Sequence, residues 1–368
     1  MVSMIESKSK TFSFRDLTVW STKLPDVKFA ILPSSNTRPN PLVAEGYIYA
    51  SIFFPGAVCA LDPGRGKLIW RHELGVHAGA SVYLHGKKLF AKTSNTLFAL
   101  QAETGEPLWL FCPYGTSKET IYSAPSARDD RVYIGDRRGY LHCLDSVNGK
   151  TIWRRLTNRS QNCSVNSTPI LMDGLVIITT NASSVLAYDA EYGELAWKQK
   201  LDGPSTFGPL VHQGCIAAVT DSLYMLTTAG EIQRRFSWNG EKLCRIESTP
   251  RNIAVSFWPQ SLWGKPDQLG KSQPGILRLL TVKSGLQQTV ALQKFCDSIR
   301  YIPTTRLLYL SHLTGIDLLH ATKRTVLCQI KTSKEARNGV ALVDVSDNKI
   351  YALTGDGRIH ALNHPTAT

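Results

Sequence analysis

An eleven-residue pattern recurs along this chain at a nearly constant interval, and it limits the possible folds more than any other feature of the sequence. The pattern has a small residue first, aspartate third in three copies, glycine seventh and tryptophan eleventh, and four copies fit it without a gap. The tryptophans of these copies are Trp70, Trp109, Trp153 and Trp197. A repeat of about 40 to 50 residues is typical of a propeller or a solenoid.

Each copy predicts two short strands joined by a tight turn. In the fourth copy one strand ends at Tyr188, Gly193 closes the turn, and a second strand carries Trp197. Glycine suits the turn because it adopts positive φ without strain from a Cβ atom. The recurring aspartate is expected to cap the turn. The turn glycines of the four copies are Gly66, Gly105, Gly149 and Gly193.

Four further copies are eroded, and the two ends of the chain complement each other. The eighth copy opens at residues 361–363 and stops before any turn or tryptophan strand. Trp20, near the start, lies on an expected strand that has no preceding hairpin. We therefore predict an all-β, eight-bladed β-propeller of four-stranded antiparallel blades, closed by the N-terminal strand joining the last blade. Residues 12–368 are expected to form this single domain, with residues 1–11 disordered or loosely attached.

In five blades a small residue followed by proline is expected to mark the start of the innermost strand, because proline is tolerated at the first residue of a strand. The sixth blade also contains a long Pro/Gly-rich stretch over residues 259–275. This stretch is either an enlarged turn between the second and third strands or a distorted innermost strand. The five prolines are Pro41, Pro125, Pro169, Pro209 and Pro250.

One tryptophan on each outer strand predicts a wedge between neighbouring blades. Burying an indole removes roughly 150 to 250 Å² from water, which is at most about 4 to 6 kcal/mol. Its N–H group needs an acceptor, and the turn glycine offers a bare peptide face for stacking. We therefore assign the tryptophans and the turn glycines to structural docking and not to a binding site.

Charge and composition bear on compartment and partner. The 368 residues carry a net charge of +13, from 42 basic and 29 acidic residues, which leaves nucleic-acid binding as one alternative. No two of the eight cysteines are adjacent and no CxxC pair occurs, so we expect reduced thiols. The first twenty residues are polar, and no apolar run approaches the length of a membrane span. These features predict a cytoplasmic protein with no membrane contact.

The pattern Ala-x-Asp-x-x-x-Gly-x-x-x-Trp resembles the tryptophan-docking repeat of pyrroloquinoline-quinone-type (PQQ-like) β-propellers. In that family eight repeats form an eight-bladed ring and each tryptophan docks between adjacent blades, which implies the same role for Trp20 and the four tryptophans named above. Family members include quinoprotein dehydrogenases, a lipoprotein scaffold of outer-membrane protein assembly, and propellers fused to acyl-adenylating enzymes.

The resemblance also implies a cofactor that this sequence supports poorly. Quinoprotein dehydrogenases of the family hold PQQ with Ca²⁺, and typically have a disulfide between adjacent cysteines and a catalytic aspartate. This chain has no adjacent cysteines, and His72, His77 and His85 do not follow a metal-ligand spacing. We therefore predict no catalytic residue, no metal and no cofactor. A PQQ-dependent oxidoreductase with Ca²⁺ is the alternative.

The remaining function is a binding platform on one rim of the propeller. Loops that enter the innermost strands share this rim with the turns between second and third strands. Arginine interspersed with tyrosine and phenylalanine is typical of protein interfaces. We predict a monomeric, non-catalytic scaffold that binds a protein or an acidic ligand there. The predicted rim residues are Tyr122, Arg137, Arg138, Asn162, Asn166, Phe207, Arg245, Arg300, Arg337 and Asn338.

Overall fold

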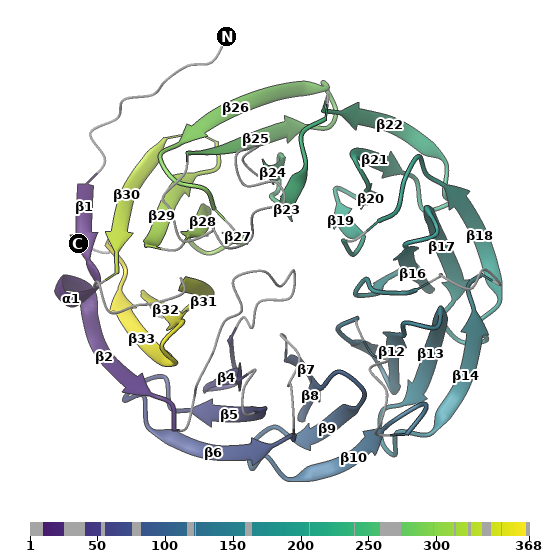
Figure 1. The fold of residues 1–368 in the computed structure, drawn as a ribbon, viewed down its shortest axis with the longest axis horizontal. Coiled ribbons are helices and arrows are strands. Elements are labelled where there is room, and N and C mark those ends of the chain that lie inside the picture. Colours follow the sequence, from purple (N-terminus) through teal and green to yellow (C-terminus); the bar gives the residue numbers. More distant parts are fainter. Residues whose placement is uncertain are drawn as a thin grey trace. The chain divides into compact units, whose positions relative to one another are not determined.

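The structure is a computed structural model, and its described residues form strands almost throughout, with one short helix (Figure 1). By contact the chain divides into two compact units, Met1–Glu73 with Glu241–Thr368, and Leu74–Gly240. The structure describes residues 10–25, 41–52, 56–75, 82–115, 121, 123–158, 164–205, 207–238, 240–257, 274–296, 298–312, 314–322, 325–332, 340–346 and 348–365.

The strands form eight sheets, each built on four antiparallel strands; in seven of them these strands follow one another in the sequence, and in the eighth β2 joins β31, β32 and β33. The fold is therefore an eight-bladed β-propeller, as the repeat predicts. We number the blades in chain order. In every blade the fourth strand is the outer one and carries the tryptophan position of the repeat (Figure 1).

Blades 2 to 5 make up the unit Leu74–Gly240. Blade 2 consists of β7 (Tyr83–His85), β8 (Lys88–Lys92), β9 (Leu97–Gln101) and β10 (Pro107–Phe111), and blade 3 of β11 (Ser126–Arg128), β12 (Arg131–Gly135), β13 (Tyr140–Asp145) and β14 (Thr151–Leu156). Blade 4 consists of β15 (Ile170–Met172), β16 (Leu175–Thr180), β17 (Ser184–Asp189) and β18 (Leu195–Lys200), and blade 5 of β19 (Leu210–His212), β20 (Cys215–Val219), β21 (Ser222–Leu226) and β22 (Ile232–Ser237).

The other unit holds blades 1, 6, 7 and 8. Blade 1 consists of β3 (Leu42–Ala44), β4 (Tyr47–Ile52), β5 (Ala57–Leu61) and β6 (Leu68–Glu73), and blade 6 of β23 (Leu243–Ser248), β24 (Ile253–Phe257), β25 (Gly275–Thr281) and β26 (Leu286–Leu292). Blade 7 contains β27 (Ser298–Ile302), β28 (Leu307–His312), β29 (Gly315–His320) and β30 (Val326–Lys331). Blade 8 consists of β31 (Val340–Ser346), β32 (Lys349–Thr354), β33 (Arg358–Asn363) and, as its fourth strand, β2 (Thr18–Lys23).

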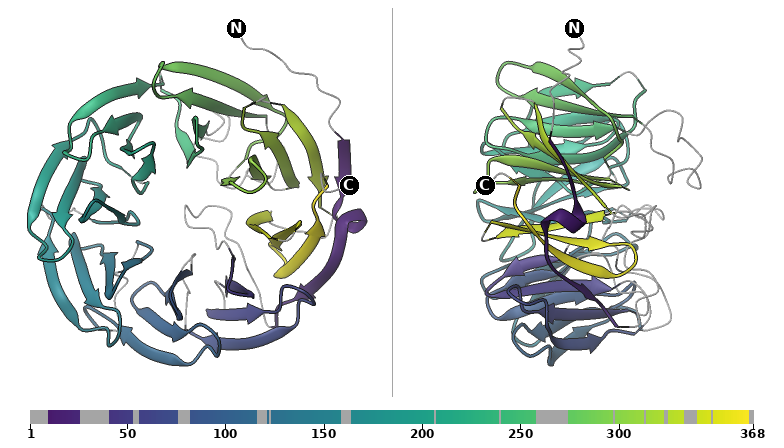
Figure 2. Two further views of the ribbon diagram at one scale, coloured as in Figure 1. Left: turned by 180° about the vertical axis from the view of Figure 1, so that it is seen from behind. Right: turned by 90° about the vertical axis from the view of Figure 1, so that its left-hand side faces the viewer.

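The N-terminal segment closes the last blade and also reinforces the blade before it. Strand β2 pairs with β33 in antiparallel register, with Trp20 opposite Ala361, so the closure predicted from the sequence is confirmed. Upstream, β1 (Lys10–Ser13) adds a fifth strand, parallel to β30 of blade 7. The sequence did not indicate this strand. Figure 2 shows the segment in purple against the yellow strands at the other end of the chain.

A one-turn helix, α1 (Phe14–Leu17), connects β1 to β2. It begins with a capping box, in which Ser13 Oγ accepts a hydrogen bond from the Asp16 N–H and an Asp16 carboxylate oxygen accepts one from the Ser13 N–H. Phe14 and Leu17 are buried in the core that blades 7 and 8 share. Residues 1–9 of the predicted N-terminal tail lie outside the described residues, and residues 10 and 11 belong to β1.

The core lies in layers between neighbouring blades. The middle strands are apolar on both faces because each face packs on the next blade; all five residues of β5 are buried, for example. Between blades 3 and 4, Tyr133, Cys143 and Trp153 meet Val176 and Ile178 in one cluster. A sheet whose two faces are both covered in this way does not need strict polar–apolar alternation.

Four of the outer-strand tryptophans lie over a turn glycine of the next blade in their own unit. Trp153 is buried, and a Cβ atom placed on Gly193 would come within 2.6 Å of its ring. The Trp153 N–H donates to the Ala190 carbonyl at 3.3 Å. Trp70 is likewise buried in blade 1, and Gly105 closes a turn of blade 2 at a φ of 74°. The same ring-over-glycine contact occurs at Trp20 with Gly66, Trp109 with Gly149, and Trp197 with Gly230.

The aspartate of the repeat caps the turn beneath the tryptophan. Asp189 Oδ1 accepts hydrogen bonds from the backbone N–H groups of Glu191 at 2.9 Å and Tyr192 at 2.6 Å. Asp62 and Asp145 make the equivalent pairs of bonds in their own blades. A side chain that holds its own turn in several blades is a structural element, which is the role the sequence predicts.

The proline rule holds in four blades and is wrong in the sixth. Strands β3, β11, β15 and β19 begin directly after a proline, whereas β23 ends before Pro250. Thr249 to Asn252 instead form the tight turn after β23, in which the Thr249 N–H donates to the Asn252 carbonyl at 2.8 Å. Proline suits the second position of such a turn because its φ is preset. Residues 259–273 of the predicted long stretch lie outside the described residues, and Gly275 is the first residue of β25.

Candidate functional site

The structure describes six of the ten predicted rim residues; Tyr122, Asn162, Arg337 and Asn338 lie outside the described residues. Arg137 and Arg138 are exposed in the turn between β12 and β13. Asn166 is exposed in the connection to β15. Phe207 is half-buried in the connection to β19, where its carbonyl accepts hydrogen bonds from Thr179 and Ser205.

Arg245 and Arg300 lie within innermost strands, β23 and β27, and not in loops. Arg300 Nη2 is 3.3 Å from Asp344 Oδ2 of β31, so its charge already has a partner. Glu247 of β23 lies near the same guanidinium and accepts a hydrogen bond from the Tyr301 N–H at 3.2 Å. Burial raises the pKa of Glu247 to about 7. The charged groups of Arg300, Asp344 and Glu247 thus lie close to one another on these innermost strands.

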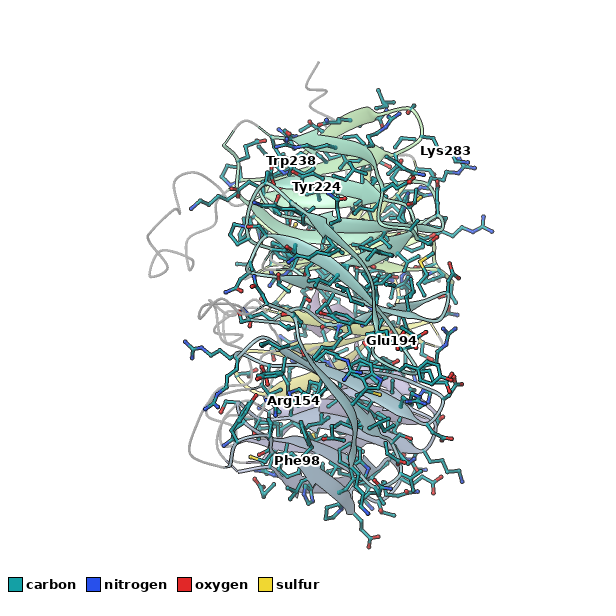
Figure 3. The ribbon with its side chains drawn as sticks, turned by 90° about the vertical axis from the view of Figure 1, so that its right-hand side faces the viewer. Phe98, Arg154, Glu194, Tyr224, Trp238 and Lys283 are labelled. Carbon is teal, nitrogen blue, oxygen red and sulfur yellow. The ribbon has the colours of Figure 1, made fainter. Side chains whose placement is uncertain are left out.

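The exposed arginines of blade 3 form a stacked cluster with two tyrosines. Arg138 Cζ lies 3.9 Å from the ring centroid of Tyr114, and Arg154 Cζ lies 3.6 Å from that of Tyr140. Arg154, labelled in Figure 3, is also 5.7 Å from the Tyr114 centroid. We call these four residues the tyrosine–arginine cluster. Within the described part of the chain, no ion pair joins Arg138 or Arg154 to a carboxylate.

A buried carboxylate holds this cluster in place. Asp136 is 1% exposed and accepts four hydrogen bonds, from Tyr114 Oη at 2.8 Å, His142 Nε2 at 2.8 Å, and the backbone N–H groups of Arg138 at 2.8 Å and Tyr140 at 2.9 Å. Burial alone would raise the pKa of Asp136, but these hydrogen bonds outweigh it and hold the pKa below its ordinary value. The carboxylate stays charged and fixes both the turn and Tyr114.

Sequence reasoning found Arg137 and Arg138 and missed Tyr114, Tyr140, Arg154 and Asp136. Arg154 directly follows a repeat tryptophan, on the outward side of β14, and Tyr140 opens the strand after the turn. Tyr114 comes from the connection after β10 of the preceding blade. A signal did exist in the run Asp136 to His142, an acid and a histidine on either side of one turn, which predicts a capped hairpin.

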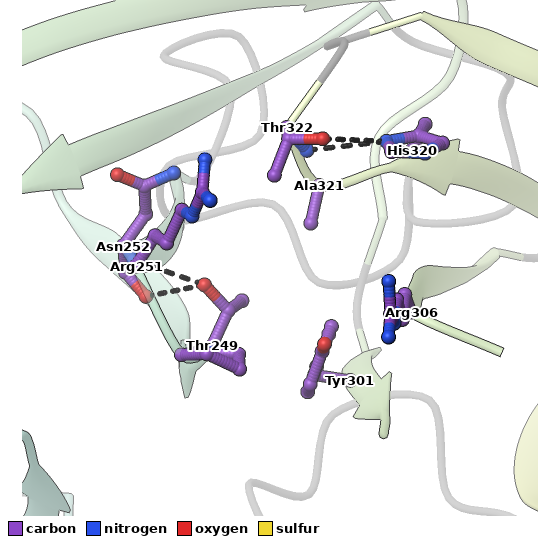
Figure 4. A pocket seen from close by; sticks show the side chains of 9 residues that line it. Thr249, Arg251, Asn252, Tyr301, Arg306, His320, Ala321 and Thr322 are labelled. Atoms are coloured by element: carbon purple, nitrogen blue, oxygen red, sulfur yellow. Dashed lines mark hydrogen bonds between the residues drawn. The ribbon is translucent and has the colours of Figure 1, made fainter. Parts of the chain in front are cut away.

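A second candidate is a pocket of about 340 Å³ between blades 6 and 7, where the repeat is most eroded (Figure 4). Three turns supply its walls, the first from blade 6 and the others from blade 7. We call it the basic seam pocket. Its lining residues are Thr249, Pro250, Arg251, Asn252, Tyr301, Arg306, His320, Ala321 and Thr322.

The seam lacks the aromatic residues that fill regular seams. In blade 3 the Tyr133 hydroxyl and the Trp153 indole both donate to the carbonyl of Ala190 in the next blade. In blade 6 the residue at the position of Tyr133, paired with the first residue of the repeat, is Ala254, and β26 carries no aromatic residue. The eroded repeat thus leaves blade 6 without these two donors toward blade 7.

Comparison with known proteins gives the family. A family model described as outer membrane protein assembly factor BamB matches residues 54–120 and 114–257, together more than half of the chain. This chain belongs to the PQQ-like repeat propeller family. The matched part of this PQQ-like propeller runs from blade 1 to β24 of blade 6, and so includes the four clean copies of the repeat.

Individual relatives match over shorter lengths. The chain is 31% identical over 144 residues to outer membrane protein assembly factor BamB of Kangiella koreensis, covering 38% of this chain and 34% of the relative. It is 30% identical over 173 residues to quinohemoprotein alcohol dehydrogenase ADH IIB of Pseudomonas putida, covering 44% of this chain and 20% of the relative. These matches therefore span about a third or less of the relatives' length.

A solved structure supports the fold over nearly the whole chain. The crystal structure of BamB from Moraxella catarrhalis superposes with a TM-score of 0.54 at 18% identity, covering 94% of this chain and 99% of that chain. At this identity the likeness concerns the fold.

The relatives correct the predicted compartment. Several of those that match in sequence are outer membrane protein assembly factors, among them BamB of Kangiella koreensis, Yersinia pestis and Pseudomonas aeruginosa. The predicted cytoplasmic location, which rested on the polar first twenty residues, is therefore wrong. Helix α1 of this PQQ-like propeller has four residues, and no helix in the described ranges is long and apolar enough to cross a membrane.

The residues that the structure describes do not assemble the quinone and calcium site that the family resemblance implies. No two cysteines are adjacent in the sequence, and the seven cysteines that the structure describes are free thiols. Among the residues with a described position, no three His, Cys, Asp or Glu side chains gather into a metal-binding group.

Proposed function

We propose that this chain is a monomeric, non-catalytic scaffold that binds acidic side chains of a protein partner on its Arg-rich rim, at the tyrosine–arginine cluster. The observation that carries the proposal is the pair of exposed guanidinium groups, Arg138 and Arg154, each stacked on a tyrosine ring within 4 Å. The assembly-factor names of several relatives support a protein-binding role.

Stacking prepares these arginines for an acidic partner. A free arginine side chain loses roughly 2 kcal/mol of rotamer entropy when it is immobilised. The rings of Tyr114 and Tyr140 already restrict Arg138 and Arg154, so a carboxylate meets donors in nearly fixed positions. The guanidinium fork matches a carboxylate with two parallel hydrogen bonds. Tyrosine and arginine are also the residue types that contribute most at protein interfaces.

The test compares two double variants with the same change in charge. Arg138→Glu with Arg154→Glu reverses the cluster, and Arg65→Glu with Lys150→Glu reverses two exposed residues in turns beneath other outer strands. A photo-crosslinking residue at Arg137 reports which protein touches the rim. We expect one specific adduct with the parent chain and the control pair, and at least a tenfold loss with the cluster pair. Equal labelling of both pairs would refute the proposal.

The alternative functions have their own readouts. Turnover with PQQ and Ca²⁺ in a dye-reduction assay, together with a rise in melting temperature, would establish a quinone-dependent oxidoreductase. Oligonucleotide binding that weakens steeply with salt would support the nucleic-acid alternative. Light scattering after gel filtration checks the monomer.

A further inference from the structure

We propose that the basic seam pocket binds an oxyanion, a phosphate or carboxylate group carried by a small molecule. The pocket is lined by two arginines and a histidine and by no carboxylate. Within the described ranges, no ion pair joins Arg251 or Arg306 to an acid. This proposal is independent of the protein-binding rim.

The blade 7 copy of the repeat has no aspartate at its third place, so this seam lacks the carboxylate that other seams have there. The third place of the repeat, which is Asp189 in blade 4, is His320 in blade 7. His320 keeps the capping function, since its Nδ1 accepts from the Thr322 N–H at 3.3 Å as Asp189 accepts from the Glu191 N–H. An imidazole that accepts at Nδ1 carries its proton on Nε2. Histidine at this place thus caps the turn without putting a carboxylate on the pocket wall.

Arg306 occupies a backbone position that favours glycine. It directly precedes the second strand of blade 7, with a φ of 57°. Blades 1, 4 and 5 have glycine directly before the second strand, at Gly46, Gly174 and Gly214, each with φ between 74° and 78°. A side chain at positive φ costs stability, so an arginine there is unfavourable for the fold alone. Its guanidinium instead lines the pocket.

The other lining residues add donors from the opposite wall. Arg251 reaches in from the turn of blade 6, while Arg306 and Tyr301 stand on the blade 7 side (Figure 4). The Asn252 side-chain oxygen accepts from Thr281 Oγ1 at 2.7 Å, which leaves its amide nitrogen as a donor. Guanidinium, amide and hydroxyl groups from both walls suit a ligand with several acceptor oxygens.

A second pocket in the same molecule serves as an internal control. It lies at the equivalent place between blades 3 and 4, has a volume of about 330 Å³, and is likewise lined by turns. Its walls contain Arg128 and Arg131 but also Asp129, Asp189 and Glu191, so positive charge is balanced there. The two pockets therefore have similar volumes and differ in charge, and of the two the one between blades 6 and 7 should attract an anion.

Calorimetric titration of the full chain tests this at constant ionic strength. Inorganic phosphate and citrate are the two probes, and they separate a phosphate site from a carboxylate site; chloride is the reference. We expect saturable binding of at least one probe. Arg306→Gly and Arg251→Gln should each raise its Kd by about tenfold or more, as the loss of one charged hydrogen bond does. Arg306→Lys keeps the charge and should raise the Kd less than Arg306→Gly.

Two controls make the result decisive. Arg128→Gln removes an arginine from the balanced pocket and should change the Kd by less than twofold. Arg306→Gly relieves the positive-φ strain, so its melting temperature should equal or exceed that of the parent chain, and weaker binding cannot be ascribed to unfolding. The proposal is overturned if neither probe binds at millimolar concentration, or if Arg128→Gln weakens binding as much as Arg306→Gly and Arg251→Gln.

Discussion

Replacing Gly193 with alanine measures the contact between a tryptophan and the neighbouring blade. The new Cβ atom would lie 2.6 Å from Cδ2 of Trp153 and 2.9 Å from Cε2 and Cε3 of the same ring. Gly174, in the same blade, is a matched control, because its φ of 74° is close to the 70° of Gly193 while nothing lies within 4 Å of its Cβ position. Both substitutions share the backbone cost, and only one meets the indole.

The expected magnitudes follow from these two costs. Alanine in the left-handed region costs about 1 to 2 kcal/mol at either position. Forcing the indole of Trp153 away adds about 1 to 3 kcal/mol, which is typical of overpacking in a close-packed interior. Gly174→Ala should therefore lower the free energy of unfolding by about 1 to 2 kcal/mol, and Gly193→Ala by about 2 to 5 kcal/mol.

Urea unfolding followed by far-UV circular dichroism gives both values, and a double-mutant cycle isolates the contact. Trp153→Ala should itself cost about 3 to 5 kcal/mol. In that background the clash is gone, so Gly193→Ala should cost no more than Gly174→Ala. If the two glycine substitutions cost the same in the parent chain, or if the Trp153→Ala background leaves the difference unchanged, the docking role of Trp153 is refuted.

Three further predictions concern unit 1 of the fold, Met1–Glu73 with Glu241–Thr368. Burial lowers the pKa of His360 to about 4, so between pH 6.5 and 4 the unfolded chain binds a proton that the folded chain does not. The free energy of unfolding should therefore fall as the pH is lowered through this range, by at most about 1.4 kcal/mol per pH unit. Urea titrations of His360→Asn should show a flatter dependence of this free energy on pH. Burial raises the pKa of Glu247 from 4.5 to about 7, so the parent chain loses stability as the pH rises through that range. Glu247→Gln should therefore be more stable than the parent chain at pH 8, by up to about 3 kcal/mol. An unchanged urea midpoint would contradict this. Deleting residues 1–13 removes β1 and should lower the melting temperature by a few degrees, whereas deleting residues 1–24 also removes β2 and should abolish cooperative melting in calorimetry.

The number of blades and the closure could be predicted because their determinants are local and repeated. A turn glycine and a tryptophan four residues later mark one hairpin in each of the four clean copies, and the four eroded copies at the same interval bring the count to eight blades. Trp20 without a hairpin and Ala361 without a partner strand identified the closing pair, which the structure confirms. The parallel pairing of β1 with β30 could not be predicted in this way, because it joins only four residues of each strand and occurs outside the repeated pattern.

The candidate sites were harder to predict because they form where the pattern is absent. The tyrosine–arginine cluster joins Tyr114 from one blade to Arg138 and Arg154 of the next, and no single stretch of sequence contains all its members. The basic seam pocket combines turns around Arg251, Arg306 and His320. Eroded repeats mark such a seam as different, but which side chains enter it depends on packing between blades.

The pairing of β2 with β33 has a consequence for synthesis on the ribosome. Trp20 emerges first but finds its partner only after Ala361 has left the exit tunnel, about 340 residues later. At typical translation rates of about 5 to 20 residues per second this delay is roughly 20 to 70 s. Throughout that time β2, which carries Trp20, has no partner strand, and the most recently synthesised blade has no neighbouring blade on its C-terminal side. Newly made chains should therefore depend on chaperones at their first residues, long after the middle of the protein has folded.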